Sequence, residues 1–284
     1  MSTLNKYLAT FNWLTLNELY NKDHLLVNSA LAYQDSLVRY VVEANEQKNS
    51  KELPVGVLHF YSTQEPSIYL GAKDTRLKRF EQATEYLKDN HYRLAQRPHG
   101  GLAVISDPGI SNVSLVTDTN YFSLSIDEGF QMMVDLVSVL FERHGLKVES
   151  YEIEDSYCPG KYDIVVNNLK IGGIAQRRFK SGVAIAAYLS INGNQAERGN
   201  LIQIFYRIGE ADSSYPDVNP DSMTTVSDLM NRDIQVSDFE NEVLNYFKAH
   251  TSLAPLYYED PQLQLIYQDM LEKQYQRSYK FNLS

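Results

Sequence analysis

The spacing of apolar positions predicts several helices along this chain. Residues 22–44 place apolar side chains at helical spacing, which predicts a long amphipathic helix. A second amphipathic helix is expected over residues 125–144, where Ser125 can cap the first turn and Asp127 and Glu128 follow it. Further helices are expected at 195–206, 236–249 and 260–275.

Short apolar runs between these helices predict the strands of a sheet. The runs cover residues 55–61, 67–70, 92–96, 102–105, 111–116 and 183–191. Two more, 162–166 and 169–176, flank the dipeptide Asn167-Asn168, which tolerates positive φ and can close a tight hairpin.

Together these patterns indicate an α/β (α+β) fold, with a mixed sheet flanked by helices. The chain shows no internal repeat and no flexible linker, so we expect a single catalytic domain over residues 1–284. Within it, residues 222–284 are expected to form a helical C-terminal extension.

Composition and charge narrow the class of protein. Hydrophobic residues make up 43% of the chain and charged residues 22%, values typical of a soluble globular protein. No apolar run is long enough to cross a bilayer, so no membrane association is expected. A single cysteine agrees with the reducing cytoplasm. The formal net charge of −10 argues against nucleic acid as the main partner.

The common cofactor signatures are missing from the sequence. It contains no P-loop, no zinc-type spacing of Cys and His, and no strand–GxGxxG–helix unit. We therefore expect neither a metal site nor a cofactor of the common nucleotide kinds.

The segment Arg97-Pro-His-Gly-Gly101 is the first candidate for chemistry. Paired glycines allow the backbone to approach a ligand closely, and their N–H groups can bind an oxyanion. Arg97 could help to hold that charge. A plain turn explains the segment equally well at this stage.

The only cysteine, Cys158, is the second candidate. It lies in a polar loop and precedes Pro-Gly, which favours a turn with an exposed thiol. Lys170 follows on the facing strand of the predicted hairpin and could offset the acidic residues of the loop. The alternatives are a small buried hydrophobic residue for Cys158 and an ordinary surface lysine for Lys170.

These segments together resemble the biotin/lipoate protein ligase superfamily. The stretch Arg97-Pro-His-Gly-Gly-Leu-Ala-Val104, continued by Asp107, Gly109, Asn112 and Ser114, resembles the lipoate-ligase signature Arg-Arg-x-Ser-Gly-Gly-Gly-Ala-Val-x-His-Asp-x-Gly-Asn. The stretch Lys170-Ile-Gly-Gly-Ile-Ala-Gln-Arg177 resembles its Lys-x-x-Gly-x-Ala-Gln-Arg element. The resemblance covers roughly residues 22–208. It implies a ligase-like catalytic domain with substrate-binding residues at Arg97, His99, Gly100, Gly101, Gly172, Gly173 and Ala175.

Two departures favour one branch of this superfamily. Leu102 replaces the third glycine of the signature and Ser106 replaces its histidine, both where a ligase holds its acyl-adenylate. A cysteine just before the lysine-bearing hairpin instead resembles the cysteine-dependent octanoyltransferases. The sequence Tyr-Cys-Pro-Gly-x-Tyr-Asp is most similar to the amidotransferases that take octanoyl from the glycine cleavage H protein.

This resemblance implies an acyltransferase without a cofactor. Cys158 would take the acyl group from octanoylated or lipoylated H protein and hold it as a thioester. Lys170 would favour the thiolate and polarise the carbonyl. The acceptors would be the lipoyl domains of 2-oxoacid dehydrogenases. Because such carriers are commonly acidic, a local basic surface is expected to dock them, and the candidates are Arg76, Lys78, Arg79, Arg177 and Arg178. Three of these lie in the basic segment 73–79, expected to open a helix that reaches about residue 88.

Three alternatives remain open from the sequence. One is an octanoyltransferase that uses acyl carrier protein as the donor, and another is an ATP-dependent lipoate ligase. The third is a member of the fold that binds carriers without catalysis. A transfer assay with octanoylated H protein separates the last from the enzymes.

Overall fold

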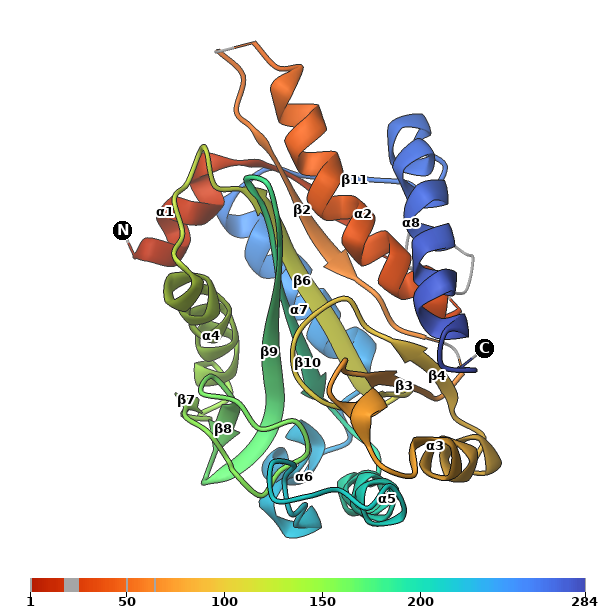
Figure 1. Ribbon diagram of the computed structural model, residues 1–284. Helices are drawn as coiled ribbons and strands as arrows, with labels where there is room; N and C mark the ends of the chain where they lie inside the picture. Colours follow the sequence, from red (N-terminus) through yellow and green to blue (C-terminus); the bar gives the residue numbers. More distant parts are fainter. Residues whose placement is uncertain (1, 18–25, 50, 64, 284) are drawn as a thin grey trace.

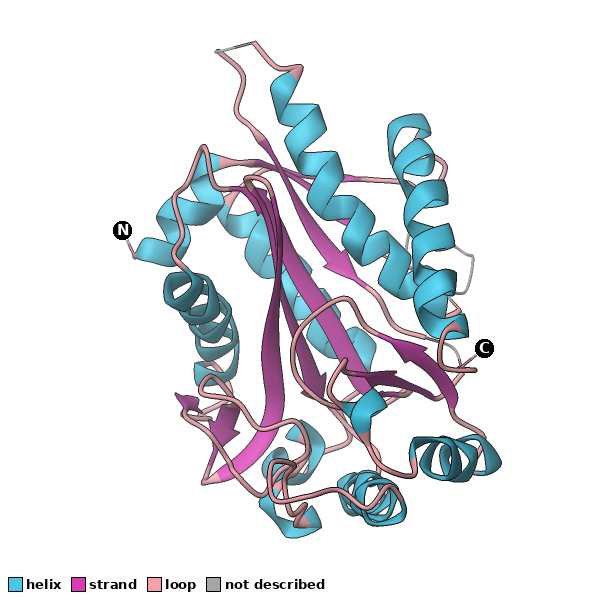
Figure 2. Cartoon of the chain, in the orientation of Figure 1, coloured by secondary structure: helices cyan, strands magenta, loops and turns pink. Residues whose placement is uncertain are grey.

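A computed structural model describes residues 2–17, 26–49, 51–63 and 65–283. In this part of the chain a large mixed sheet of eight strands carries helices on both faces (Figures 1 and 2). Its strand order is β11 (Leu253–Pro255), β1 (Asn12–Leu16), β2 (Val55–Phe60), β6 (Ile110–Asp118), β10 (Gly182–Ser190), β9 (Leu169–Phe179), β8 (Ile164–Val166) and β7 (Glu149–Ser150). The predicted mixed sheet flanked by helices is therefore confirmed.

A second, smaller sheet lies beside the large one. It has the order β4 (Arg93–Gln96), β3 (Ser67–Leu70) and β5 (Val104–Ser106). The segment between β4 and β5 is the glycine-containing turn of the sequence signature. The small sheet thus holds both ends of that turn.

Apolar side chains on the two faces of the large sheet form two cores. The helices α1 (Thr3–Thr10), α4 (Ile126–Glu142) and α7 (Val236–His250) cover one face. The helix α2 (Val27–Glu46) covers the other, where α8 (Pro261–Tyr279) packs against it. Every residue of β6 and β10 is buried, because both strands are covered on both faces.

The remaining elements are short or peripheral. They are α3 (Phe80–Asp89), α5 (Gln195–Ile208), α6 (Val226–Met230) and the 3₁₀ turns η1 (Asp74–Arg76) and η2 (Pro220–Ser222). None of the helices in the described part of the chain is long and apolar enough to cross a membrane.

Most predicted elements appear close to their expected bounds. The helix expected at 22–44 begins at Val27, and residues 22–25 of that prediction lie outside the described residues. Ser125 caps α4 through a reciprocal capping box with Glu128, as its sequence indicates. At the hairpin, Asn167 and Asn168 adopt φ values of 53° and 63°, which confirms the predicted turn.

Two segments differ from the expectation. The basic segment 73–79 does not open a helix, because it forms the short turn η1 and α3 begins only at Phe80. The C-terminal residues are not purely helical, since β11 joins the edge of the large sheet in parallel register with β1. That pairing satisfies backbone groups that β1 would otherwise expose.

The hairpin turn gives a test of how the fold positions β9. The free energy of unfolding of the Asn168→Val variant should be about 1–2 kcal/mol lower than that of Asn168→Gly, because a β-branched residue is strained at positive φ. Both variants lose the hydrogen bond that the Tyr151 hydroxyl donates to Asn168, so glycine is the matched control. Equal stability in urea denaturation would contradict the assignment of this turn.

Candidate active site

Cys158 occupies a constrained position between the two sheets. Its φ is 49°, in the left-handed region that residues with a Cβ seldom adopt. The half-buried Sγ accepts hydrogen bonds from Nη2 of Arg97 and from the backbone N–H of Leu102, each at 3.2 Å. The sulfur therefore faces a positive charge and a backbone N–H dipole, and both can stabilise negative charge that develops on it during a reaction.

Lys170 holds the loop that carries Cys158. Its buried ammonium donates to the hydroxyl of Ser156 at 3.0 Å and to the carbonyls of Tyr157 and Cys158 at 3.0 and 2.8 Å. It also pairs with the carboxylate of Asp163 at 2.9 Å. Four oxygens thus surround the ammonium of Lys170, which lies at the start of β9, the second strand of the hairpin.

Asp163 completes this buried network. Its carboxylate also accepts from the N–H groups of Ile153 and Gly160, at 3.2 and 3.3 Å. Burial raises the pKa of Asp163 above its ordinary value, and the Lys170 ammonium opposes that rise. Removal of either partner would leave an uncompensated charge in the interior, which typically costs about 3–5 kcal/mol.

The contacts of Lys170 and Arg97 around the thiol differ from the sequence-based expectation. Lys170 was expected to offset the acidic loop at the thiol, but its described contacts are with the loop carbonyls and Asp163. The guanidinium of Arg97 contacts the sulfur instead. The loop oxygens and the Asp163 carboxylate take up the hydrogen bonds that the Lys170 ammonium can donate.

The glycine turn is packed tightly against this site. Gly101 has a φ of 97°, and a Cβ there would lie 2.3 Å from Nη2 of Arg97 and 3.0 Å from Sγ of Cys158. A Cβ on Gly71 would lie 1.9 Å from the carbonyl oxygen of Gly101. Glycine at both positions is therefore required for Arg97 and Cys158 to meet.

A cavity of about 480 Å³ extends from Cys158. It includes six of the seven residues expected to bind substrate, namely Arg97, His99, Gly100, Gly101, Gly173 and Ala175. Gly172 is not among its lining residues, and a Cβ on Gly172 would meet the Tyr188 carbonyl at 2.4 Å. Close packing of β9 on β10 accounts for that glycine.

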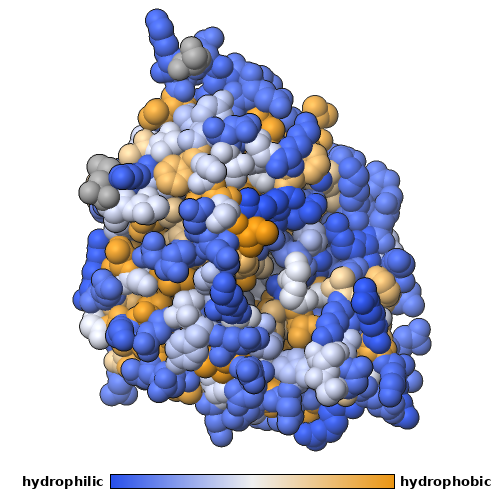
Figure 3. Space-filling view, turned by 60° about the vertical axis from the view of Figure 1, so that its left-hand side comes forward, coloured by the Kyte–Doolittle hydropathy of each residue, from blue (hydrophilic) through white to orange (hydrophobic). Residues whose placement is uncertain are grey.

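The cavity opens near the start of α4. Ile126 belongs to its lining and is nevertheless 61% exposed. Ala186 of β10 forms part of the wall, where its small side chain leaves room between the sheet and α2. Figure 3 shows one face of the molecule, on which hydrophobic side chains gather in small patches among hydrophilic ones.

His99 lines the cavity as a neutral imidazole. Burial lowers its pKa to about 3, and the charges of Arg97, Arg177 and Arg277 act in the same direction. No described residue is a hydrogen-bond partner of its Nε2. His99 therefore brings no positive charge to the cavity wall.

Several residues of the site were missed by the sequence reasoning. The N–H of Leu102 contacts the sulfur, one residue beyond the glycines expected to supply such a donor. Tyr61, Tyr69 and Tyr188 line the cavity but carry no motif signal. Asp163 ends the sequence Tyr-Cys-Pro-Gly-x-Tyr-Asp, so its motif position could have identified it.

The basic residues proposed for docking fall into two groups. Arg76, Lys78 and Arg79 are exposed, and Arg79 pairs with Glu210 at 2.8 Å. The other two are half-buried and engaged within the fold. Arg177 pairs with Asp35 at 2.9 Å, and Arg178 donates to the carbonyls of Leu124 and Ser125. The contacts of Arg177 and Arg178 within the fold explain their positions.

The fold is that of a lipoyl protein ligase-like catalytic domain. Residues 27–248 match the family described as the lipoyl protein ligase A/B catalytic domain, and the chain belongs to this family. The predicted family is therefore confirmed.

Curated relatives specify the branch further. An octanoyl-[GcvH]:protein N-octanoyltransferase of Bacillus velezensis is 34% identical over 220 residues, which is 75% of this chain and 77% of the relative. One of Staphylococcus epidermidis is 33% identical, covering 84% of this chain and 82% of the relative. A lipoyl-[GcvH]:protein N-lipoyltransferase of Listeria monocytogenes is 40% identical, covering 61% of this chain and 64% of the relative.

Solved structures with the same fold include two ligases. A lipoate protein ligase of T. acidophilum with bound lipoic acid has a TM-score of 0.69 and 19% identity, and covers 96% of this chain and 99% of its own. Lipoate-protein ligase A bound with ATP has a TM-score of 0.69 and 20% identity, and the match covers 96% of this chain and 99% of the ligase. At this identity the likeness establishes the fold.

The contact between Arg97 and the sulfur can be tested by alkylation. The Arg97→Met variant should react with iodoacetamide at pH 7 about tenfold more slowly than the unmodified chain, because it loses the cation that stabilises negative charge on the reacting sulfur. Arg79→Met removes an exposed arginine from the surface and serves as the control. Equal alkylation rates in the two variants would contradict the assigned contact.

Proposed function

We propose that this chain is an N-octanoyltransferase that moves an octanoyl or lipoyl group between lysine side chains of carrier proteins through a thioester on Cys158. The observation that carries the proposal is the position of the Cys158 sulfur. It lies beside Arg97 and the Leu102 N–H and lines a cavity of about 480 Å³. The names of the relatives describe the same overall transfer.

The reaction balances without ATP. The Cys158 thiolate attacks the carbonyl carbon of the donor amide, and the C–N bond breaks as a C–S bond forms. The leaving lysine nitrogen takes up the proton that the thiol released. The acceptor lysine then attacks the thioester in the reverse sense and restores the thiolate.

Each contact of the site has a role in this scheme. Arg97 and the N–H of Leu102 stabilise negative charge first on sulfur and then near the attacked carbonyl oxygen, where one such donor is typically worth about 3 kcal/mol. Lys170 acts as a positioning residue, because its contacts with the Cys158 carbonyl and Asp163 hold the loop at its unusual φ.

The cavity suits the acyl chain. Ala186 contributes a wall with little side-chain volume, and Leu31 and Val104 contribute apolar surface. Burial of a methylene group typically contributes about 0.8 kcal/mol. The acyl chain would then lie beneath α2, with the scissile bond at Cys158.

We assign octanoylated or lipoylated glycine cleavage H protein as the donor and lipoyl domains of 2-oxoacid dehydrogenases as the acceptors. The names of the relatives, which print GcvH as the donor, support this assignment. We also assign the chain to the cytoplasm and propose that it acts without a bound cofactor. Its free thiol is consistent with a reducing compartment.

An ATP-dependent ligase is the second candidate, and the solved ligases of the same fold favour it. Against it, Leu102 directs its N–H at a cysteine, and Ser106 accepts from Asn112 at 2.8 Å within the core. Octanoyl-acyl carrier protein remains an alternative donor for the same cysteine chemistry. Acylation of a lipoyl domain by free octanoate that requires ATP would favour the ligase.

The thioester can be observed directly. The chain mixed with octanoylated H protein should gain one octanoyl group, detected by intact mass and removed by hydroxylamine at neutral pH. The Cys158→Ala variant should gain none and lose transfer to a lipoyl domain by at least about a thousandfold, because no second nucleophile replaces the thiol. Full transfer by this variant would exclude the covalent mechanism.

Docking gives a second test of the proposed function. Reversal of Arg76 and Arg79 to Glu should lower the transfer rate about tenfold at physiological salt, because an acidic carrier would then meet like charge. The matched control reverses the exposed Arg232 and Lys248, which changes net charge equally at another place. Equal rates for the two double variants would refute this docking surface.

A further inference from the structure

Both donors to the Cys158 sulfur come from chain segments that contact the end of β3. The backbone N–H of Arg97 donates to the carbonyl of Leu70 at 2.9 Å. Gly71 comes next in the chain and packs against the peptide bond whose N–H, that of Leu102, donates to the sulfur. The position of this short stretch therefore decides where both donors lie.

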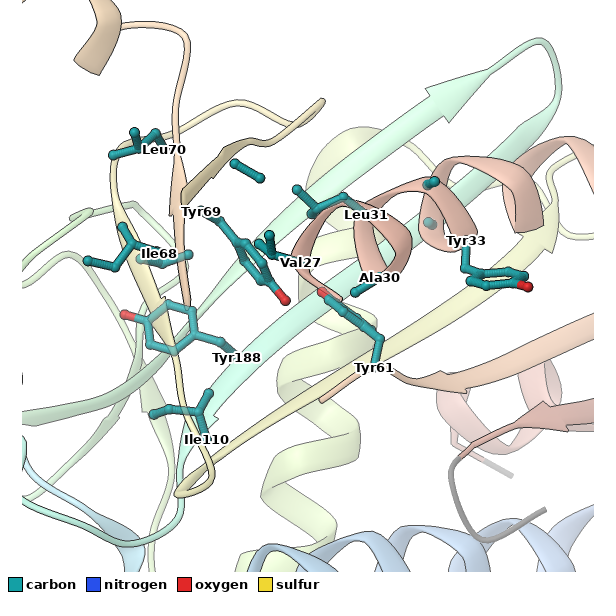
Figure 4. Close-up of a cluster of buried hydrophobic side chains, with 14 of the residues drawn as sticks. Val27, Ala30, Leu31, Tyr33, Tyr61, Ile68, Tyr69, Leu70, Ile110 and Tyr188 are labelled. Carbon is teal, nitrogen blue, oxygen red and sulfur yellow. The ribbon is translucent and has the colours of Figure 1, made fainter. Parts of the chain in front are cut away.

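The contact at Gly71 leaves no free space. A Cβ there would lie 1.9 Å from the carbonyl oxygen of Gly101 and 3.1 Å from Cα of Leu102. Figure 4 shows Tyr69, two residues earlier in β3, directed toward Tyr61, and both tyrosines line the cavity. Because these atoms are in contact, a shift of Gly71 moves the peptide bond that faces the sulfur.

A buried carboxylate fixes Gly71. Asp74 is fully buried, and its Oδ2 accepts from the N–H of Gly71 at 2.7 Å while its Oδ1 accepts from the hydroxyl of Tyr206 at 3.0 Å. Tyr206 is a buried residue of α5, 132 residues away in the sequence. The backbone of Ala103, which follows Leu102, hydrogen-bonds to the same hydroxyl. The carboxylate thus holds the turn after β3 against the core of the molecule.

The charge of Asp74 does not by itself assist the thiol. Both of its hydrogen-bond donors are neutral, and burial raises the pKa of Asp74 to about 6, so the group is ionised at pH 7. The charges of Arg97 and Lys73 favour this ionised form. Because Arg97 also contacts the sulfur, the carboxylate and a negatively charged sulfur compete for one guanidinium. Any favourable effect of Asp74 on the reaction must therefore come from geometry.

We propose that Asp74 is a positioning residue for the reaction at Cys158, because its contacts with Gly71 and Tyr206 hold the Leu102 N–H and Arg97 in place at the sulfur. This inference rests on the proposed function. It adds a residue that favours thioester formation without touching the substrate. The simpler alternative is that Asp74 only closes the local turn 71–74, which predicts no effect on the thiol.

Alkylation of Cys158 by iodoacetamide at pH 7 tests the inference without a substrate. Asp74→Ala leaves the Gly71 N–H without its acceptor and should react about tenfold more slowly than the unmodified chain, less than the roughly hundredfold that a 1 Å misplacement can cost. Asp74→Asn loses the charge but keeps an oxygen that accepts from Gly71, so it should react at least as fast as the unmodified chain. Charge alone predicts that both variants react faster.

Formation of the thioester gives a second measurement. In a single turnover with octanoylated H protein, Asp74→Ala should lower the maximal rate of adduct formation about tenfold, and Asp74→Asn should restore it. The H protein concentration that gives half the maximal rate should stay the same, because the exposed Arg76 and Arg79 are still present.

Asp118→Ala is the matched control. Asp118 is also a buried carboxylate that accepts from a backbone N–H, that of Asn120 at 2.9 Å. It lies at the end of β6, six residues or about 20 Å beyond Asn112 of the cavity wall. This variant should lose stability while both rates stay unchanged.

A milder variant keeps the test valid if Asp74→Ala does not fold. Tyr206→Phe removes only the hydroxyl that donates to Asp74, and the bond from Gly71 remains. It should slow alkylation about threefold, an effect of the size that one hydrogen bond produces.

The outcomes separate this inference from the proposed function. Equal alkylation of Asp74→Ala, Asp118→Ala and the unmodified chain overturns the positioning role, as does faster alkylation of both Asp74 variants. Asp74→Asn as slow as Asp74→Ala also overturns it. A higher half-saturating concentration of H protein with unchanged alkylation assigns Asp74 to docking and overturns it as well. Absence of any adduct on the unmodified chain overturns the proposed function, while alkylation still decides the role of Asp74.

Discussion

The buried ion pair between Lys170 and Asp163 is the constraint on which the site depends. It joins the first residues of β9 to the segment that follows Cys158, and the same ammonium holds the carbonyls of Tyr157 and Cys158. Charges removed from water are stable only when every polar contact is made. The loop is therefore fixed in one conformation, and Cys158 is held at a φ that few residues with a side chain adopt.

A second constraint brings the two sheets together at the sulfur. Arg97 leaves β4 of the small sheet, while Cys158 precedes the hairpin of the large one, and they meet where Gly71 and Gly101 lack side chains. The Arg97 guanidinium bridges the Leu102 carbonyl and the Cys158 sulfur. The contact between Arg97 and the sulfur thus depends on how closely the two sheets pack.

Much of the fold could be predicted because the relevant signals are local. The spacing of apolar residues identified α2, and the capping box at Ser125 identified the start of α4. The turn at Asn167-Asn168 followed from residues that tolerate positive φ. The basic segment 73–79 misled the same reasoning, because helical propensity there is overridden by the turn that packs Gly71 against Gly101.

The sequence by itself determined the family, the single thiol and the two motifs that surround it, since these are written in short stretches of chain. Only the tertiary structure decided which cation touches the sulfur, because Arg97 and Cys158 are brought together by packing and Lys170 is satisfied by loop oxygens. It also decided which residues line the cavity. Asn112 and Tyr188 meet there through the pairing of β6 with β10, and strand register is not visible in the local pattern of either strand.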